Sequence, residues 1–201
     1  AAVSPDGRTL ALLAQDRIDL WDVRTGRVTR TLSGVDAMQT PFDFTGRTLA
    51  AVDWDDGGVH AWDPRSGRST LRIPEPDGGV DGLAASPDGR WLALCTGGHA
   101  VQLWDLTHRR KVSAPWVAKA RAADCRDHAL DFTPDSRTLT VVGDDGIHGW
   151  DPRTGRATPL AKADGLTQVW PGGDGTFLVG TGPHRLVVWR AARPWVPVLR
   201  R

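Results

Sequence analysis

Residues Ser4 to Arg27 read SPDGRTLALLAQDRIDLWDVRTGR, and the chain repeats this unit four more times. Each copy contains a turn rich in Pro, Asp and Gly, an apolar run, a short polar gap and an alternating run that ends on Trp. The later copies begin at Phe44, Ser86, Thr133 and Gly172. The fold therefore follows from one unit and its repetition.

The last residue of the alternating run is a tryptophan in every copy, and we expect these five side chains to be buried structural anchors: Trp21, Trp62, Trp104, Trp150 and Trp189. They are separated by 41, 42, 46 and 39 residues. A period of about 40 residues predicts a β-propeller. We expect one domain, with blades at approximately residues 1–34, 35–76, 77–117, 118–163 and 164–201.

Each unit is predicted to form four antiparallel strands. In the first copy, an apolar run from Leu10 to Ala14 precedes the alternating residues Ile18 and Leu20, and Gly26 supplies the positive φ of a hairpin before Val28–Leu32. No stretch has helical periodicity, and turn residues recur about every 8 to 12 positions, so we expect an all-β fold. One such sheet cannot cover its own faces, so the sheets must stack around an axis.

The chain resembles the WD-repeat β-propeller family in its Ser-Pro-Asp-Gly-Arg turn and in the Trp-Asp pairs at Trp21, Trp62, Trp104 and Trp150. The resemblance covers the whole chain. It departs from the family pattern because no copy has the Gly-His pair before the first strand, and because Arg190 follows the fifth Trp. The family's aspartate six residues before the Trp remains as Asp56 and Asp144, so we expect its buried Asp-His-Ser/Thr-Trp network to be incomplete.

Only three residues precede Ser4, so the first strand of the first blade is shorter than its equivalents. The fifth blade supplies its own outer strand, near Trp195 to Leu199. Members of the resembled family usually close seven blades. We therefore expect part of a longer chain, with five blades of a larger, seven-bladed ring.

The charge composition is nearly balanced, with 25 basic and 24 acidic residues. This balance argues against nucleic acid or an anionic membrane as a partner. Of the basic residues, only Lys111, Lys119 and Lys162 are lysines, a bias associated with high-GC bacterial genomes. No apolar run approaches the roughly 18 residues of a membrane helix, so we expect a soluble segment.

The two cysteines, Cys95 and Cys125, have no metal-ligand spacing and are too few for a disulfide framework. We expect reduced thiols and a cytoplasmic location. The alternative is a disulfide, because Cys95 ends a strand and Cys125 lies in a connection that emerges on the same face.

No catalytic, cofactor or metal site is predicted. His60 and His148 both lie two residues before the anchor Trp, in a slot that Asp19 and Gln102 fill elsewhere, so we interpret them as tolerated surface residues. No pair of histidines has the spacing of a zinc site. The serines are few, and none lies in a nucleophile elbow.

Candidate binding residues lie in the gaps and connections. Asp53, Asp55, Asp56, Asp144 and Asp145 resemble fragments of a calcium loop, but the full ligand pattern is missing and hairpin turn chemistry explains them better.

Three further features suggest recognition. Trp54 is an aromatic residue in a polar loop, where a partner anchor and a tucked-in plug are equal alternatives. His99 lies in another such gap. The longest connection carries Trp116, Arg121 and Arg126, and long propeller loops often bind partners.

We interpret the chain as a non-catalytic protein-interaction scaffold or sensor module of a larger bacterial signalling protein, which binds a protein or peptide on its loop faces. One alternative is a cofactor-binding enzyme similar to quinoprotein propellers, although the repeating Trp follows the turn in that family and precedes it here. The other alternative is a structural spacer.

Strand alternation also predicts how charge is distributed. One rim should collect the arginines of the first-to-second and third-to-fourth turns, and the opposite rim should collect most carboxylates. The acidic rim should be the clearer one. A basic partner is therefore expected there, near Trp54.

Overall fold

The structure is a computed structural model that describes residues 1–14, 17–33, 41–53, 56–112, 122, 125, 129–162, 165–173, 175–190 and 196–200. These residues form five four-stranded antiparallel sheets, in agreement with the predicted all-β propeller class. In every sheet the strands lie side by side in chain order. None of the described residues forms a helix long and apolar enough to cross a membrane.

The strands of the first sheet are β1 (Ala2–Val3), β2 (Thr9–Ala14), β3 (Arg17–Asp22) and β4 (Arg27–Ser33). Those of the second are β5 (Phe42–Thr45), β6 (Thr48–Val52), β7 (Val59–Trp62) and β8 (Ser69–Ile73). The third contains β9 (Val80–Ala85), β10 (Trp91–Thr96), β11 (Ala100–Asp105) and β12 (Arg110–Lys111). The fourth contains β13 (Leu130–Phe132), β14 (Leu139–Gly143), β15 (Gly146–Trp150) and β16 (Ala157–Ala161), and the fifth β17 (Gln168–Pro171), β18 (Phe177–Gly182), β19 (Arg185–Arg190) and β20 (Val196–Arg200).

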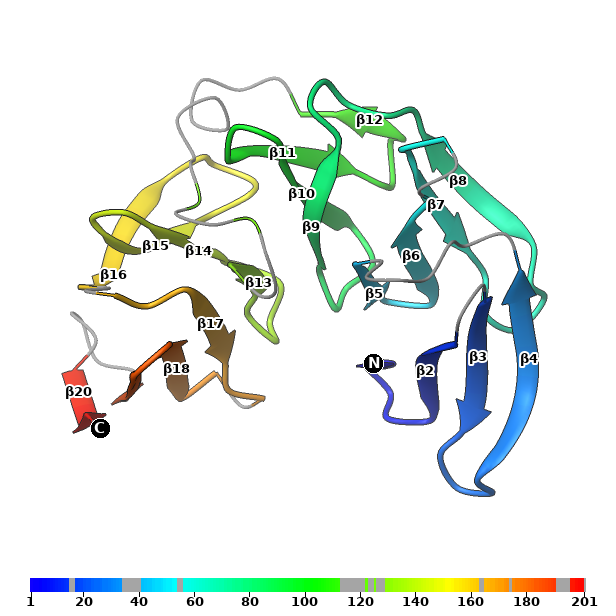
Figure 1. The fold of residues 1–201 in the computed structure, drawn as a ribbon, viewed down its shortest axis with the longest axis horizontal. Helices are drawn as coiled ribbons and strands as arrows, with labels where there is room; N and C mark the ends of the chain where they lie inside the picture. The colour runs from blue at the N-terminus through cyan, green and yellow to red at the C-terminus, as the bar shows by residue number, and fades with distance from the viewer. Residues whose placement is uncertain are drawn as a thin grey trace.

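The sheets are arranged in an open arc. Figure 1 shows the first strands of the middle sheets, β5, β9 and β13, on the inside and the fourth strands on the outside. The first and fifth sheets form the two ends of the arc, and no described element lies between them (Figure 1).

The turns between strands are stabilised by aspartates. In the first-to-second turns, the carboxylates of Asp6, Asp88 and Asp135 each accept two hydrogen bonds. One comes from the hydroxyl of the serine or threonine two residues earlier, and the other comes from the backbone N–H of the arginine two residues later. In the third-to-fourth turns, the aspartate of each Trp-Asp pair accepts N–H bonds from the turn, as Asp63 does from Arg65 and Ser66. These N–H bonds hold the pKa of Asp63 below its ordinary value.

The core lies between neighbouring sheets rather than within them. Leu92 of β10 is fully buried against the second sheet, where it packs with Val52 and Val59. Its equivalents Leu49, Leu139 and Leu178 are buried in the same way. In the second to fifth sheets, the side chain at this position therefore packs in the interface with the preceding sheet.

The terminal sheets each have one uncovered face. Leu10 occupies the position of Leu92 in the first sheet and is only half-buried. Leu186 of β19 is 37% exposed, whereas its equivalents Ile18 and Ile147 are fully buried. No described sheet lies against either face, so the packing pattern of the repeat stops at both ends of the arc.

The five anchor tryptophans lie at equivalent positions on the third strands. Trp62 and Trp189 are buried, while Trp21, Trp104 and Trp150 are half-buried. The indole nitrogens of Trp21 and Trp104 are buried and have no hydrogen-bond partner. The Asp-His-Ser/Thr-Trp network is thus incomplete in these sheets, as predicted.

The two cysteines are joined by a disulfide, so the expectation of free thiols is wrong. Cys95 on β10 and Cys125 in the following connection lie 5.4 Å apart between Cα atoms, within the normal range for a disulfide. The sequence allowed this pairing but did not favour it. Disulfides persist mainly in oxidising compartments, so the bond counts against the cytoplasmic location, which stays a prediction.

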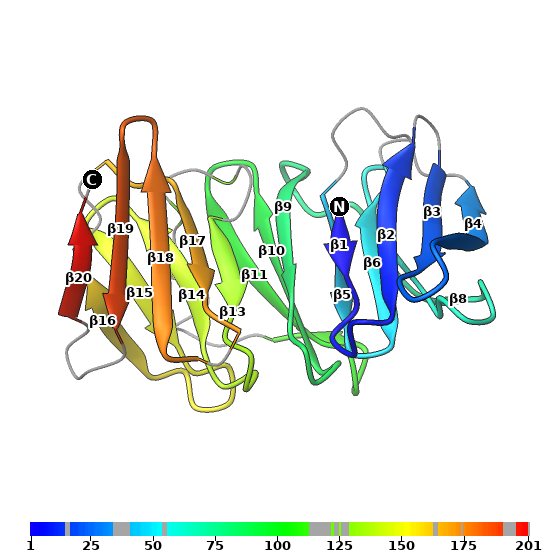
Figure 2. The same ribbon diagram turned by 90° about the horizontal axis from the view of Figure 1, so that it is seen from below.

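The strands run between two rims, which Figure 2 shows from the side. The turn rim carries the first-to-second and third-to-fourth turns. It is held together across sheets by Asp88, whose N–H donates to Ser136 Oγ at 2.9 Å and whose carboxylate lies 3.8 Å from Arg153. The connection rim carries the second-to-third turns and the connections between sheets, for example where Gly97 N–H donates to Gly78 at 3.1 Å.

Candidate functional site

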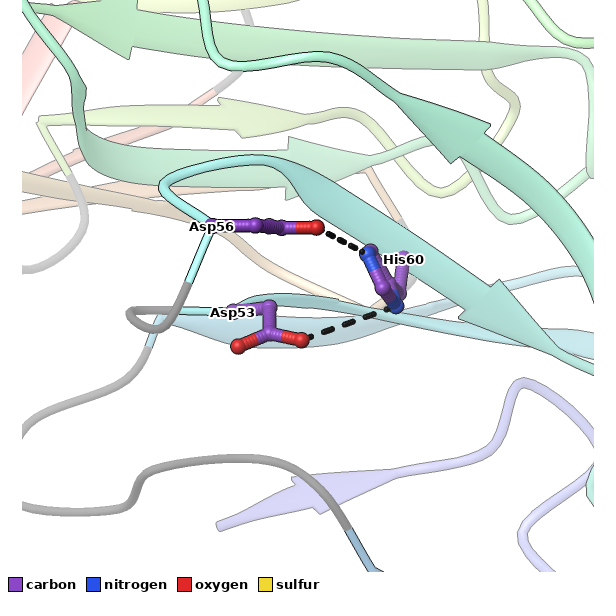
Figure 3. A group of neighbouring side chains, drawn as sticks. All are labelled: Asp53, Asp56 and His60. Carbon is purple, nitrogen blue, oxygen red and sulfur yellow. Dashed lines mark hydrogen bonds and ion pairs between the residues drawn. The ribbon is translucent and has the colours of Figure 1, made fainter.

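A cluster of two carboxylates and one imidazole lies on the connection rim of the second sheet (Figure 3). Asp53 directly follows β6, Asp56 lies in the turn, and His60 is the second residue of β7. Asp53 N–H donates to the Gly58 carbonyl at 2.8 Å, so it continues the pairing of β6 with β7. Because His60 pairs with Ala51, two residues before Asp53, both side chains project from the same face of the sheet.

The imidazole of His60 lies between the two carboxylates (Figure 3). Its Nε2 is 3.0 Å from Asp56 Oδ2, and its Nδ1 is 3.7 Å from Asp53 Oδ2. Asp56 also accepts a bond from Gly58 N–H at 2.8 Å and pairs with the Arg72 guanidinium of β8. Asp53 is only 7% exposed, so the cluster is anchored in the protein on one side and open to solvent on the other.

The electrostatics of the cluster favour ionised Asp56. Partial burial opposes its ionisation, but the Gly58 N–H bond, the contact with His60 and the bond from Arg72 together lower the pKa of Asp56 below its ordinary value. Asp56 therefore carries a full negative charge at neutral pH.

The turn that holds Asp56 requires glycine. Gly57 has a φ of +67°, which other residues rarely adopt. A side chain on Gly58 would lie 2.6 Å from the Ile73 carbonyl oxygen and 3.0 Å from Asp56 Oδ1. The predicted hairpin chemistry therefore explains the glycines and the position of Asp56, but not His60.

Sequence reasoning interpreted His60 as a tolerated surface residue, and the structure corrects this. Its side chain is 19% exposed and lies 5.8 Å from the Trp62 ring, centroid to centroid. The sequence did contain a signal for this contact. Asp53 comes at the end of one predicted strand and His60 near the start of the next, and residues in register on adjacent strands share a face of the sheet.

The other predicted binding residues lie elsewhere on the connection rim. Asp144 and Asp145 form the exposed turn between β14 and β15, and Asp145 Oδ1 is 2.7 Å from His148 Nε2. His99 is exposed in the turn after β10, with a φ of 63° and its Nδ1 3.2 Å from the Ala122 carbonyl oxygen. Of the predicted binding residues that the structure describes, only Asp53 and Asp56 belong to the three-residue cluster.

Five of the predicted binding residues lie outside the described part of the chain: Trp54, Asp55, Trp116, Arg121 and Arg126. Their roles stay predictions.

Two carboxylates on the innermost strands were not singled out in the sequence. Asp43 of β5 and Asp131 of β13 occupy equivalent register positions on either side of β9. Asp43 accepts N–H bonds from Phe44 and from Ala85 of β9. Burial raises the pKa of Asp43 to about 6, and burial together with the Asp43 charge raises that of Asp131 to about 7.

Known proteins were compared with the chain by sequence. No protein-family model matches it. Protein LST8 homolog of Drosophila melanogaster is 34% identical over 99 residues, which are 48% of this chain and 31% of that protein. Periodic tryptophan protein 2 homolog of Neurospora crassa is 26% identical over 128 residues, or 63% of this chain and 14% of that protein.

A solved structure resembles nearly the whole chain. A chain in a crystal structure of the mitotic checkpoint complex has a TM-score of 0.74 and 21% identity, and the match covers 99% of this chain and 64% of that one. The comparisons support the WD-repeat family. The all-β propeller fold with WD-type sheets is confirmed.

The chain spans about a third of the length of the LST8 homologs it matches. These relatives come from animals and a fungus, so the comparisons do not support the bacterial origin inferred from composition.

Proposed function

We propose that this WD-repeat segment is a non-catalytic scaffold that binds protein segments on its rims, with a basic segment on the connection rim. The observation that carries the proposal is the separation of charge between the two rims. Exposed carboxylates of the second, third and fourth sheets lie on the connection rim: Glu75, Asp77, Asp81, Asp144 and Asp145. Among the described residues, no ion pair engages any of these except Asp145, which contacts His148.

The turn rim carries the opposite charge and favours a second candidate, an acidic segment. Its arginines, all exposed except Arg90, are Arg8, Arg24, Arg27, Arg47, Arg65, Arg68, Arg90, Arg109, Arg110, Arg137, Arg153 and Arg156. The aspartates of the same turns accept backbone N–H bonds and keep their negative charge, so they offset part of the arginine excess. The expectation that the acidic rim is the clearer one depends also on carboxylates outside the described residues, so it stays a prediction: Asp16, Asp36, Asp55, Asp124, Asp127 and Asp164.

One experiment separates these candidates. Binding of a lysine-rich and a glutamate-rich peptide of equal length is measured by fluorescence anisotropy at low and physiological salt. The connection-rim variant D77N/D81N/D144N/D145N should lose the basic peptide and keep the acidic one, and the turn-rim variant R65Q/R68Q/R153Q/R156Q should do the reverse. Both affinities should fall as salt rises, because exposed charges are screened. If both variants bind both peptides like the unaltered chain, the charged rims are not the binding surfaces.

The wider context is also part of the proposal. The segment is proposed to be a module of a larger bacterial signalling protein, for which the arginine-rich composition supports only the bacterial origin and the resemblance to WD repeats suggests the signalling context. The uncovered faces of the first and fifth sheets support a larger ring. A cofactor-binding role predicts a visible absorbance band or an added mass in the purified protein. A spacer role predicts that neither peptide binds.

A further inference from the structure

We propose that Asp53, Asp56 and His60 form a binding site for a divalent transition-metal ion such as Zn²⁺. Each residue offers one ligand atom, and the three atoms lie within 4.8 Å of one another. They converge from the end of β6, the following turn and β7 (Figure 3). This inference goes beyond the scaffold function and does not depend on it.

The donor set fits this class of ion. Two carboxylate oxygens and one imidazole nitrogen are common zinc ligands, and three protein ligands leave a position for water. In a tetrahedral site, two ligand atoms that each lie about 2.1 Å from the ion are about 3.4 Å apart. A pair at the 4.8 Å limit would therefore have to approach by about 1.4 Å, so the side chains have to rotate when the ion binds.

The charges also favour a cation. The cluster holds two carboxylates, and a divalent ion that displaces the Arg72 guanidinium from Asp56 would balance both of their charges. Asp53 is the most deeply placed of the ligands and loses most of its contact with water. A bound divalent ion would neutralise the cluster without the need to protonate the imidazole.

Arg72 is the competitor for the site. Its guanidinium contacts Asp56 Oδ2, the same oxygen that faces His60, but its side chain is 63% exposed. A long exposed side chain withdraws at little cost. Removal of the guanidinium should therefore strengthen metal binding, whereas a purely structural network would only be weakened by the same change.

The fourth sheet contains a matched control. His148 occupies the slot of His60, two residues before the anchor Trp, and pairs with Asp145 at 2.7 Å. Gly143, in place of Asp53, ends the preceding strand, so the second carboxylate is missing. Among the described residues, only the cluster of the second sheet gathers three metal-ligating side chains.

The test is isothermal titration of ZnCl₂ into the chelator-treated 201-residue chain at neutral pH. We expect one saturable ion per chain, with binding weakened at least about tenfold by Asp53→Asn and by His60→Gln. His148→Gln should bind like the unaltered chain, and Arg72→Gln should bind more tightly.

Far-UV circular dichroism of every variant checks folding. If His60→Gln does not fold, Asp53→Asn and Arg72→Gln decide, since both change the surface of the cluster without altering the strand pairing. The absence of saturable Zn²⁺ binding would overturn the proposal. Equal binding by Asp53→Asn and the unaltered chain, or weaker binding by Arg72→Gln, would overturn it as well.

Discussion

The same substitution at equivalent positions of two sheets should have different costs. Leu92→Ala removes three carbons from a side chain with no exposed surface between the second and third sheets. At about 0.8 kcal/mol for each buried carbon the transfer cost is roughly 2.4 kcal/mol, and the cavity raises it to about 3–5 kcal/mol. Leu10→Ala removes the same atoms from a half-buried side chain that no described sheet covers, so it should cost only about 1 kcal/mol.

The assay is urea unfolding at constant temperature, followed by tryptophan fluorescence and by circular dichroism. Coincident transitions and an unchanged m-value would show that the free energies of unfolding are comparable. The reasoning is refuted if Leu10→Ala costs as much as Leu92→Ala, because Leu10 would then be covered in solution, by another copy or by an element at the end of the arc. A cost below about 1 kcal/mol for Leu92→Ala would refute the assignment of the core to the inter-sheet layers.

Three further outcomes are expected from the same unfolding assay. Cys125→Ser should lower the free energy of unfolding by about 3–4 kcal/mol, because the bond closes a loop of 30 residues, and an unchanged value would show that the thiols are free in solution. Because the folded pKa of Asp131 is raised to about 7, its contribution to stability is lost as pH rises from about 4 to 7; Asp131→Asn should therefore gain stability relative to the unaltered chain over that range, and a stability difference that does not change with pH would contradict this. Asp105→Ala should cost about 2 kcal/mol, because the carboxylate accepts N–H bonds from Thr107 and His108 and contacts Arg90, and a cost near zero would show that the turn holds without it.

The architecture was predictable because the same pattern of turns and apolar runs occurs five times in the sequence. The period places the tryptophans on third strands, and the alternation around Ile18 assigns one face of β3 to the core, as the structure shows. These features depend only on local pattern and on sheet stacking, which one sequence is enough to reveal.

The features that sequence analysis did not predict are contacts between segments whose relative positions do not follow from the repeat. The disulfide joins Cys95 of a regular strand to Cys125 of a connection, whose path is not fixed by the period. The raised pKa of Asp131 depends on burial and on the charge of Asp43, two sheets away along the chain. Neither pair has a spacing that sequence alone could interpret.

The proposed metal site of Asp53, Asp56 and His60 was only partly predictable from the repeat. It shows how substitutions at one repeated strand position can create a cluster of ligating side chains. The slot two residues before the anchor Trp holds Asp19 in β3, where it accepts a bond from Thr31 at 2.7 Å. In β7 and β15 the slot holds histidine, and each imidazole pairs with an aspartate of the preceding turn. The turns differ in length, since Asp53 pairs with Gly58 and Gly143 with Gly146, but Asp53 and Gly143 occupy the same register position. We expect the difference between a single pair and a three-residue cluster to depend on which of these two residues is present. Gly143→Asp should therefore give the fourth sheet a second metal site, and an unchanged stoichiometry of one ion per chain would show that the slot alone does not determine the chemistry.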